Sequence, residues 1–117
     1  MLVKNSRISK KKEFDDIFKK GKSTRGTFFI LKFLKNDLKL NRFAFMVSKK
    51  ISLKAVVRNK IRRRLSEAVK EFRTESDKGV DVVFLTLPAI KDKSFSEIKT
   101  ETDKFLEKII SKNKDFK

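Results

Sequence analysis

Residues 48–69, SKKISLKAVVRNKIRRRLSEAV, combine dense positive charge with the apolar spacing of an amphipathic helix. Half of the positions from 49 to 64 are Lys or Arg. Apolar residues nevertheless recur on one side of a helical wheel: Val57, Ile61, Leu65, Ala68 and Phe72. The pattern predicts a helix from about Lys54 to Phe72 that packs one stripe against a core and holds the rest of its surface out as a rigid basic array.

The charge balance of the whole chain indicates a polyanionic partner. Its 117 residues carry 32 Lys and Arg against 15 Asp and Glu, a formal net charge of +17. Such self-repulsion opposes a compact fold unless a partner neutralises it, so nucleic acid is the first candidate and an anionic membrane surface the second. A solvated helix kept soluble by its own charge is the simplest alternative.

Length and hydropathy favour one cytoplasmic domain. The N-terminus lacks the apolar stretch of a signal peptide, and no segment approaches the roughly 18 apolar residues of a membrane span. We therefore expect a soluble, intracellular chain without a membrane partner, monomeric on its own. Residues 1–117 should form a single nucleic-acid-binding domain with frayed ends at 1–8 and 112–117.

The residue types that are missing narrow the chemistry. The chain contains no His and no Cys, and therefore lacks the commonest general base at neutral pH, the thiolate nucleophile and the usual zinc ligands. Its carboxylates are scattered along the sequence. We expect no catalytic residue and no metal site in this polypeptide.

Five further elements follow from hydrophobic periodicity. Helices are predicted over residues 10–20, with Gly21 as the stop, and from about Ser94 onward, where Ser94 and Glu97 have the spacing of a capping box. Strands are predicted over 27–34, 42–48 and 80–87.

Alternation along these strands separates two faces. It places Phe29, Leu31 and Phe33 in the core, and Phe28, Ile30 and Lys32 on the opposite face. In the next strand, Ala44, Met46 and Ser48 share a face whose small side chains leave room for a ligand.

Aromatic and basic residues suggest how nucleic acid could be held. All twelve aromatic residues are Phe, and Phe14, Phe18 and Phe28 are candidates for partial exposure. An open ring beside Lys suits single-stranded nucleic acid, because bases stack on rings while cations track phosphates. Arg is concentrated at 58, 62, 63 and 64, where planar guanidinium groups can bind phosphate through two hydrogen bonds.

Residues 47–69 resemble the signature of the bacterial ribonuclease P protein component, which runs roughly V-S-K-K, a short loop, then A-V-x-R-N-x-x-K-R-x-x-R-E. The matching residues are Val47, Ser48, Lys49, Lys50, Ala55, Val56, Arg58, Asn59 and Arg63. Arg62 replaces a lysine, and Glu67 fits the end of the pattern. The order of the predicted elements is also similar to that of the family over most of the chain.

The resemblance implies an α+β fold: a single-domain, two-layer α/β sandwich of order αβββαβα, similar to a ribosomal-protein fold, with a left-handed βαβ crossover. The third strand before the basic helix is then expected within residues 42–52.

The resemblance also implies an accessory role in an endoribonuclease. In this family the RNA subunit carries out the magnesium-dependent removal of the 5′ leader from precursor tRNA. The protein helps to bind the leader and favours productive binding of Mg²⁺, which is held mainly by the RNA subunit and the substrate. The implied partners are thus the ribonuclease P RNA subunit and precursor tRNA.

Two sets of site residues follow from the same resemblance. Contacts to the RNA subunit are expected from Arg58, Asn59, Lys60, Arg62, Arg63 and Arg64. The single-stranded leader is expected to lie against Phe14, Phe18, Phe28, Lys32, Met46, Ser48, Lys49 and Lys50, with Ala44 on the same sheet face.

Three positions depart from the family pattern. The loop at 52–54 lacks the usual Gly and is one residue longer, and Lys32 occupies a strand position often held by an aromatic residue. Ser66 stands where an arginine is usual, with Arg64 or Lys70 as possible substitutes.

Two other classes of protein share this charge and size. A structural RNA-binding protein, such as a ribosomal protein, would need no leader-binding cleft. A DNA-binding regulator would need a recognition helix and a symmetric dimer, and nothing in the sequence resembles a helix-turn-helix.

Overall fold

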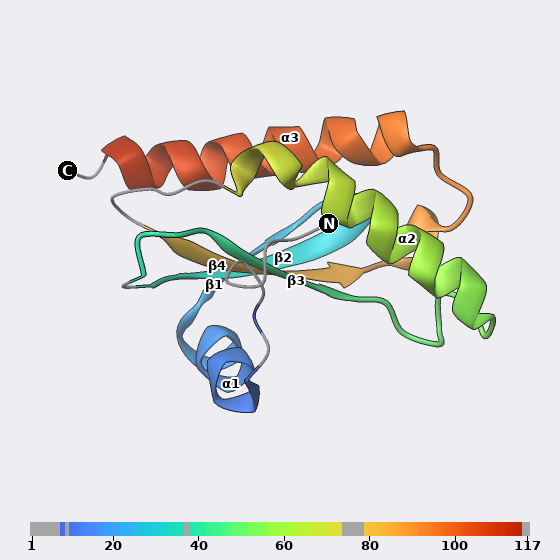
Figure 1. The fold of residues 1–117 in the computed structure, drawn as a ribbon, viewed down its shortest axis with the longest axis horizontal. Helices are drawn as coiled ribbons and strands as arrows, with labels where there is room; N and C mark the ends of the chain where they lie inside the picture. The colour runs from blue at the N-terminus through green and yellow to red at the C-terminus, as the bar shows by residue number, and fades with distance from the viewer. Residues whose placement is uncertain (1–7, 9, 37, 74–78, 116–117) are drawn as a thin grey trace.

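The computed structural model describes residues 8, 10–36, 38–73 and 79–115, with side chains up to residue 110 (Figure 1). In chain order the elements are α1 (Lys11–Lys20), β1 (Lys22–Arg25), β2 (Phe29–Lys35), β3 (Arg42–Met46), α2 (Ala55–Ala68), the 3₁₀ turn η2 (Lys70–Phe72), β4 (Val80–Thr86), the 3₁₀ turn η3 (Pro88–Ile90) and α3 (Phe95–Asp115). This arrangement confirms the α+β class and the order αβββαβα.

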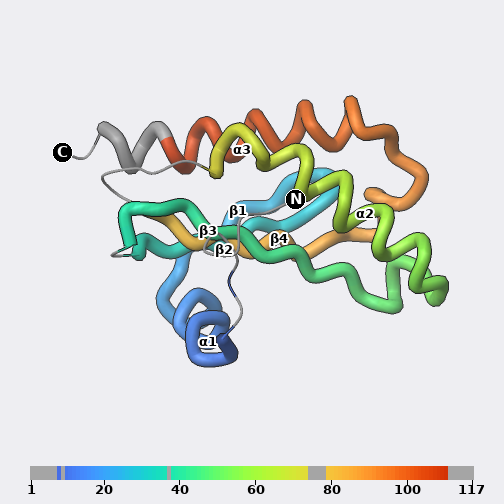
Figure 2. Tube along the Cα trace, in the orientation of Figure 1, coloured from blue at the N-terminus to red at the C-terminus, as the bar shows by residue number. Residues whose placement is uncertain are grey.

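One four-stranded mixed sheet organises the fold, in the order β1-β2-β4-β3. β2 pairs antiparallel with both β1 and β4, whereas β3 pairs parallel with β4. The β3-α2-β4 segment is therefore the βαβ unit, whose left-handed sense stays a prediction. Helices α2 and α3 lie on one side of the sheet and α1 lies alone on the other (Figures 1 and 2).

The main core lies between the sheet and helices α2 and α3. Alternate residues of the central strands point into it, and the rings of Phe29, Phe84 and Phe45 meet edge to face or tilted, with centroids 5.0 and 5.3 Å apart. Helix α2 contributes Ile61, Leu65 and Ala68, all buried. The apolar stripe predicted for the basic segment is confirmed.

A second, smaller core holds α1 against the opposite face. Ile17 of α1 is 1% exposed and packs with Val83 of β4 and with Ile8, whose N–H donates to the carbonyl of Phe43. The helix ends at Lys20 and is capped by Gly21, as predicted. Glycine is required at this position because a Cβ would lie 2.4 Å from the carbonyl oxygen of Ile17.

The position of the third strand before α2 was predicted wrongly. It is β1 (Lys22–Arg25), ahead of β2, and it does not lie within 42–52. Its sequence KSTR shows no apolar alternation because β1 is an edge strand whose side chains are mostly exposed. Its place depends on hydrogen bonding to β2 and cannot be inferred from its own periodicity.

Phe28 lies on the side opposite to the one predicted. β2 begins at Phe29, because the carboxylate of Glu101 in α3 accepts hydrogen bonds from the backbone N–H groups of Thr27 (3.0 Å) and Phe28 (2.8 Å). Phe28 therefore precedes the regular alternation and packs against the main core, with the Lys93 ammonium 5.8 Å from its ring centroid.

The remaining boundaries differ modestly from the predictions. Regular α2 ends at Ala68 and the predicted last turn to Phe72 is a 3₁₀ turn. α3 starts after Ser94, whose hydroxyl accepts the N–H of Glu97, and runs to Asp115. Ile8 is buried and residues 112–115 are helical, whereas residues 1–7, 9, 116 and 117 lie outside the described part, so fraying at 1–8 and 112–117 stays a prediction. None of the helices in the described residues is both long and apolar enough to cross a membrane.

Candidate nucleic-acid interface

The sheet surface that faces α1, here called the α1 face, carries two rows of side chains across the strands. One row runs Lys32, Val83 and Ala44, and the next runs Ile30, Leu85 and Met46. Directly opposite residues in neighbouring strands point to the same side of a sheet, so these six share the α1 face. The predicted face of Ala44 and Met46 is confirmed.

Helix α1 covers only part of this face. Met46 is 46% exposed and Phe18 of α1 is 38% exposed, whereas Phe14 is partly buried against the small core. The Lys32 ammonium lies 5.9 Å from the centroid of the Phe18 ring. An exposed ring and an adjacent cation therefore stand together, which is the combination that single-stranded nucleic acid requires.

The loop that follows β3 carries exposed polar and basic groups soon after Met46. Ser48, Lys49 and Lys50 are all exposed, and the Ser48 hydroxyl accepts the backbone N–H of Lys50 at 3.3 Å. The structure does not bring the predicted leader-binding residue Phe28 to the α1 face, because Phe28 lies against the main core.

Arg25 on the α1 face was missed by the sequence reasoning. It pairs with Ile30 across the β1–β2 ladder, so its exposed side chain lies on the α1 face at the edge of the second row. No apolar signal marks β1 as a strand. Only the pairing with β2 reveals which way this cation points.

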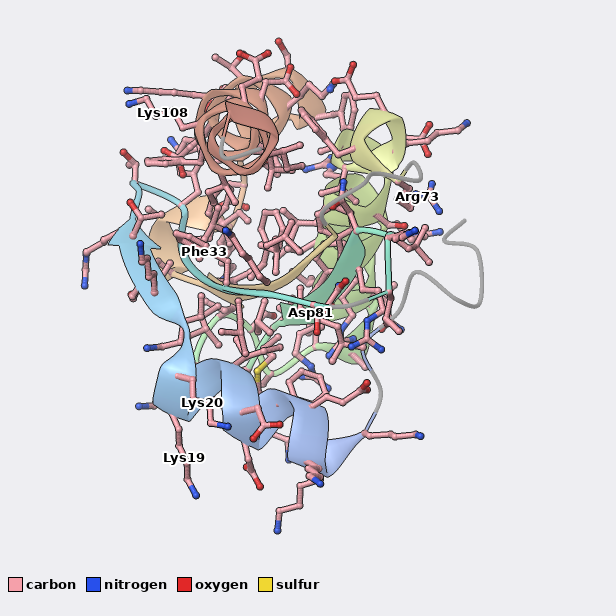
Figure 3. The ribbon with its side chains drawn as sticks, turned by 90° about the vertical axis from the view of Figure 1, so that its left-hand side faces the viewer. Lys19, Lys20, Phe33, Arg73, Asp81 and Lys108 are labelled. Atoms are coloured by element: carbon pink, nitrogen blue, oxygen red, sulfur yellow. The ribbon has the colours of Figure 1, made fainter. Side chains whose placement is uncertain are left out.

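A buried ionic cluster fixes α1 relative to the sheet. Arg42 of β3 donates two hydrogen bonds to the Asp81 carboxylate of β4, at 2.8 and 2.7 Å, and one to Glu13 of α1 at 2.7 Å. The side chains of Arg42 and Asp81 are 11% and 8% exposed, and Asn36 also donates to Asp81. Figure 3 shows Asp81 on the α1 side of the sheet and Phe33 on the α3 side.

The carboxylates of this cluster favour the charged form of Arg42. The hydrogen bond to Asp81, followed by that to Glu13, outweighs desolvation and raises the pKa of Arg42 above its ordinary value. The sequence reasoning missed the cluster because Arg42 lies 29 residues from Glu13 and 39 from Asp81.

The predicted RNA-subunit residues on α2 fall into two groups. Three guanidinium groups donate to carbonyls of the chain itself: Arg58 to Ser52 and Leu53, Arg62 to Val47, and Arg64 to Lys93. Arg62 also donates to the side chain of Asn59 at 2.7 Å. A guanidinium has five N–H groups, so each of these arginines keeps donors for a ligand.

Lys60 and Arg63 form the second group. Both side chains are exposed, and neither makes an ion pair or hydrogen bond with any described residue. Arg63 and Asn59 lie roughly opposite the buried stripe of Ile61 and Leu65 on the helical wheel. The outward edge of α2 is therefore the most accessible cationic surface of the predicted set.

The model of the Ribonuclease P family matches residues 2–110. The chain belongs to this family. The match spans every element of the fold up to Ile110, including both the α1 face and the basic helix.

Individual relatives agree with the family match. The ribonuclease P protein component of Syntrophomonas wolfei is 38% identical over 95 residues, which cover 81% of this chain and 79% of that protein. That of Caldanaerobacter subterraneus is 33% identical over 108 residues, covering 92% of each. The structure of the Staphylococcus aureus RNase P protein superposes with a TM-score of 0.75 at 30% identity, covering 92% of this chain and 96% of that one.

The structure shows the surroundings of each position where the sequence departs from the family pattern. The long loop at 52–54 is held by Arg58, which bonds the carbonyls of Ser52 and Leu53, both at 3.0 Å. Ser66 is half-buried, and Arg64, offered as its substitute, instead points to the turn before α3 and bonds the Lys93 carbonyl at 2.5 Å. Lys32 contacts Phe18 on the α1 face.

Proposed function

We propose that this chain is the protein subunit of a ribonuclease P, acting as an endoribonuclease only together with the RNA subunit that carries the catalysis. The family match and the named relatives support the assignment. The net charge of +17 supports an RNA partner, because neutralising phosphates releases their counterions. The reaction is removal of the 5′ leader from precursor tRNA.

The RNA subunit binds along the outward edge of α2. Arg63 and Lys60 supply free cations there, and the remaining donors of Arg58 and Arg62 extend the same edge toward the loop after β3. Their own carbonyl partners hold these two guanidinium groups in place. Little side-chain entropy is then lost on binding phosphate.

The single-stranded leader binds on the α1 face. The main support for leader binding is the exposed Phe18 ring with the Lys32 ammonium beside it. The sheet surface next to them consists of Ala44, Val83 and Leu85. Bases stack on the ring, and the leader phosphates follow Lys32, Arg25, Lys49 and Lys50. Because the Arg42 cluster fixes α1, the distance between ring and sheet is set before the leader arrives.

Magnesium belongs to the RNA in this proposal. The described residues include no group of three or more carboxylates that could hold a metal ion, and the residues proposed for the leader are neutral or basic. Mg²⁺ would supply the charge stabilisation of phosphodiester hydrolysis from sites on the RNA subunit and substrate. No residue of this chain is assigned to it.

The test is cleavage of a precursor tRNA by the cognate RNA subunit at low magnesium, with and without the protein. We expect a large rise in rate that disappears when the leader is shortened to one nucleotide. A rise that is independent of leader length would contradict the role of the α1 face. No rise, with binding to structured RNA retained, would favour a structural RNA-binding protein.

A further inference from the structure

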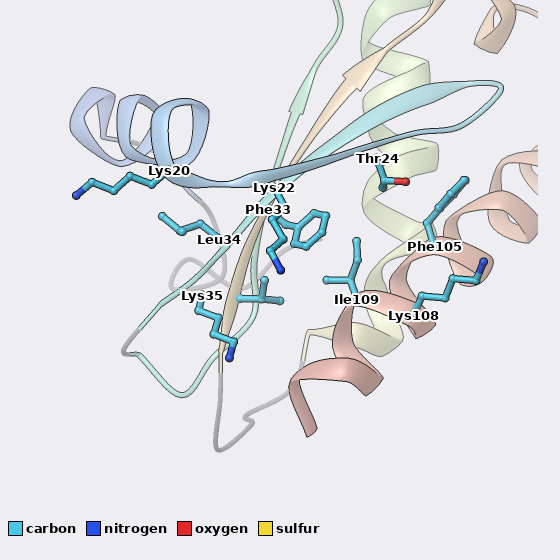
Figure 4. Close-up of a pocket in the computed structure, with 10 residues that line it drawn as sticks. Lys20, Lys22, Thr24, Phe33, Leu34, Lys35, Phe105, Lys108 and Ile109 are labelled. Atoms are coloured by element: carbon cyan, nitrogen blue, oxygen red, sulfur yellow. The ribbon is translucent and has the colours of Figure 1, made fainter. Parts of the chain in front are cut away.

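A cavity of about 440 Å³ opens at the β1 edge of the sheet, on the side of α3 (Figure 4). Its apolar wall on the α3 side is formed by Phe33, Val80, Phe105 and Ile109, and Leu34 lines the cavity from the α1 side of β2. The volume lies in the range of roughly 300 to 1,000 Å³ that is typical of sites for small organic ligands.

Two partly buried rings contribute to this wall. Phe33 and Phe105 are both partly buried against the main core, so each presents only part of its ring. The Phe105 ring meets Phe29 edge to face, with centroids 6.2 Å apart, which restrains its orientation. A planar group could stack here without displacing a core residue.

The polar rim of the cavity is entirely neutral or cationic. Lys20, Lys22, Lys35 and Lys108 line it with Thr24, and no Asp or Glu does. Figure 4 shows Lys22 beside Phe33 and Lys108 on the same side as Phe105, whereas Lys20 points away. Lys22 and Lys108 are exposed and have no carboxylate partner among the described residues. Figure 4 shows them on opposite sides of the cavity, so each can attract an anion at its own side of the mouth.

The cavity is separate from the α1 face. Phe33 lies opposite Lys22 and Val82 in the ladder and points to the α3 side, whereas its neighbour Lys32 points to the α1 side. The sheet therefore stands between Phe33 and the ring of Phe18, and Leu34 alone of the apolar lining lies on the α1 side. A ligand here would not compete directly with one on the α1 face.

We propose that this cavity binds a nucleotide. The base lies against the apolar wall at Phe33 and Phe105, the phosphate stays at the mouth, where Lys22 and Lys108 make the rim positive, and the Thr24 hydroxyl hydrogen-bonds a polar edge of the base. The nucleotide is either free or an unpaired residue of an RNA chain. This site does not depend on the leader-binding role of the α1 face.

The direct test is an NMR titration of the ¹⁵N-labelled protein with adenosine monophosphate, and separately with inorganic phosphate. We expect adenosine monophosphate to shift the amide signals of Thr24, Val80 and Ile109, and to bind at least tenfold more tightly than phosphate. Equal affinity for the two would overturn the proposal, because the base would then contribute nothing. So would shifts confined to Ala44, Met46 and their neighbours.

Two double lysine variants of equal charge, one at the cavity and one away from it, test where the phosphate binds. The double variant Lys22→Met, Lys108→Met should weaken binding of adenosine monophosphate at least tenfold. The control Lys39→Met, Lys91→Met removes the same charge from two exposed positions outside the cavity and should change the affinity less than twofold. Equal losses in the two proteins would show a general charge effect and overturn the site.

A variant of the ring tests the base. Phe105→Leu keeps an apolar side chain in the core, and a folded amide spectrum confirms that the protein is intact. Its affinity for adenosine monophosphate should fall to that for phosphate, while an unchanged affinity would overturn the stacking.

Titration with an adenosine pentanucleotide distinguishes RNA from a free nucleotide as the ligand. Much tighter binding that is lost in the Lys22→Met, Lys108→Met protein indicates RNA. Affinity equal to that of the mononucleotide indicates a free nucleotide.

Discussion

The two faces of the sheet are made by alternate residues of the same strands, yet one is closed and the other is partly open. Phe29, Phe43 and Phe84 point to α2 and α3 and are at most 1% exposed. On the α1 face a single ten-residue helix covers the sheet, and Met46 and Phe18 remain 46% and 38% exposed. One face therefore supplies stability, and the other keeps apolar surface available for a ligand.

The closed face should show the largest effect of a single truncation. Phe84→Ala removes a ring that contacts both Phe29 and Phe45, and should lower the free energy of unfolding by about 3 to 5 kcal/mol. Its neighbour Leu85 lies on the α1 face, so Leu85→Ala should cost clearly less. Urea unfolding of both variants at fixed salt measures the difference, and equal losses would remove the distinction between the faces.

The ionic cluster under α1 comes next. Arg42→Met leaves the buried Asp81 carboxylate without its partner and should cost about 3 kcal/mol of unfolding free energy. The double variant Arg42→Met, Asp81→Leu should regain part of that loss, because no unpaired charge is then buried. Additive losses in a double-mutant cycle would show that the pair is not coupled.

Phe18 tests the open face itself. Phe18→Ala should cost about 1 to 3 kcal/mol in binding precursor tRNA to the holoenzyme, and little in binding mature tRNA. Phe95 is 39% exposed at the start of α3 and provides the matched control, since Phe95→Ala should affect neither. If Phe18→Ala instead weakens both RNAs equally and lowers stability by several kcal/mol, Phe18 is a core residue.

The outward edge of α2 should respond to salt. Arg63→Ala removes an exposed cation with no partner in the described residues, so the slope of log K for the RNA subunit against log salt should fall by about 1 while unfolding is unchanged. Arg64→Ala should instead mainly reduce stability, because Arg64 bonds the Lys93 carbonyl. An unchanged slope for Arg63→Ala would place the RNA elsewhere.

The smallest effect on the free energy of unfolding is expected at Lys99 of α3, which forms ion pairs with Glu71 and Asp103. Burial lowers the pKa of Lys99, but hydrogen bonds to Asp103 and Glu71 outweigh it, so the pKa lies above its ordinary value of 10.5. The resulting stability is complete below pH 10.5 and is lost as the pH rises through the folded pKa. Lys99→Met should therefore cost up to about 1 kcal/mol at pH 7, and the difference from wild type should shrink above pH 10.5. Unfolding curves from pH 7 to 11.5 measure this, and a constant difference would contradict it.

Much of the candidate site was predictable from local patterns. The buried stripe of α2, the shared face of Ala44 and Met46, and the stop of α1 at Gly21 all follow from spacing between neighbours in the sequence. The strand β1 and its Arg25 were not predictable in this way, because an exposed edge strand has no apolar alternation. The prediction for Phe28 was wrong for a similar reason. Alternation places a side chain correctly only within a regular strand, and β2 begins one residue later, at Phe29.

The sequence alone determined the three helices and the strands β2, β3 and β4, where positive charge is concentrated, and which residues of each segment are apolar. These properties depend on residues within a few positions of one another. The tertiary structure decided which face stays open, and it did so through contacts between distant residues. Glu101 accepts the N–H of Thr27 across 74 positions, next to the point where Phe28 packs against the core, and Arg42 donates to Glu13 across 29 positions and ties α1 to the sheet. Such contacts exist only once the chain has folded, because no local spacing encodes the partner of a buried charge.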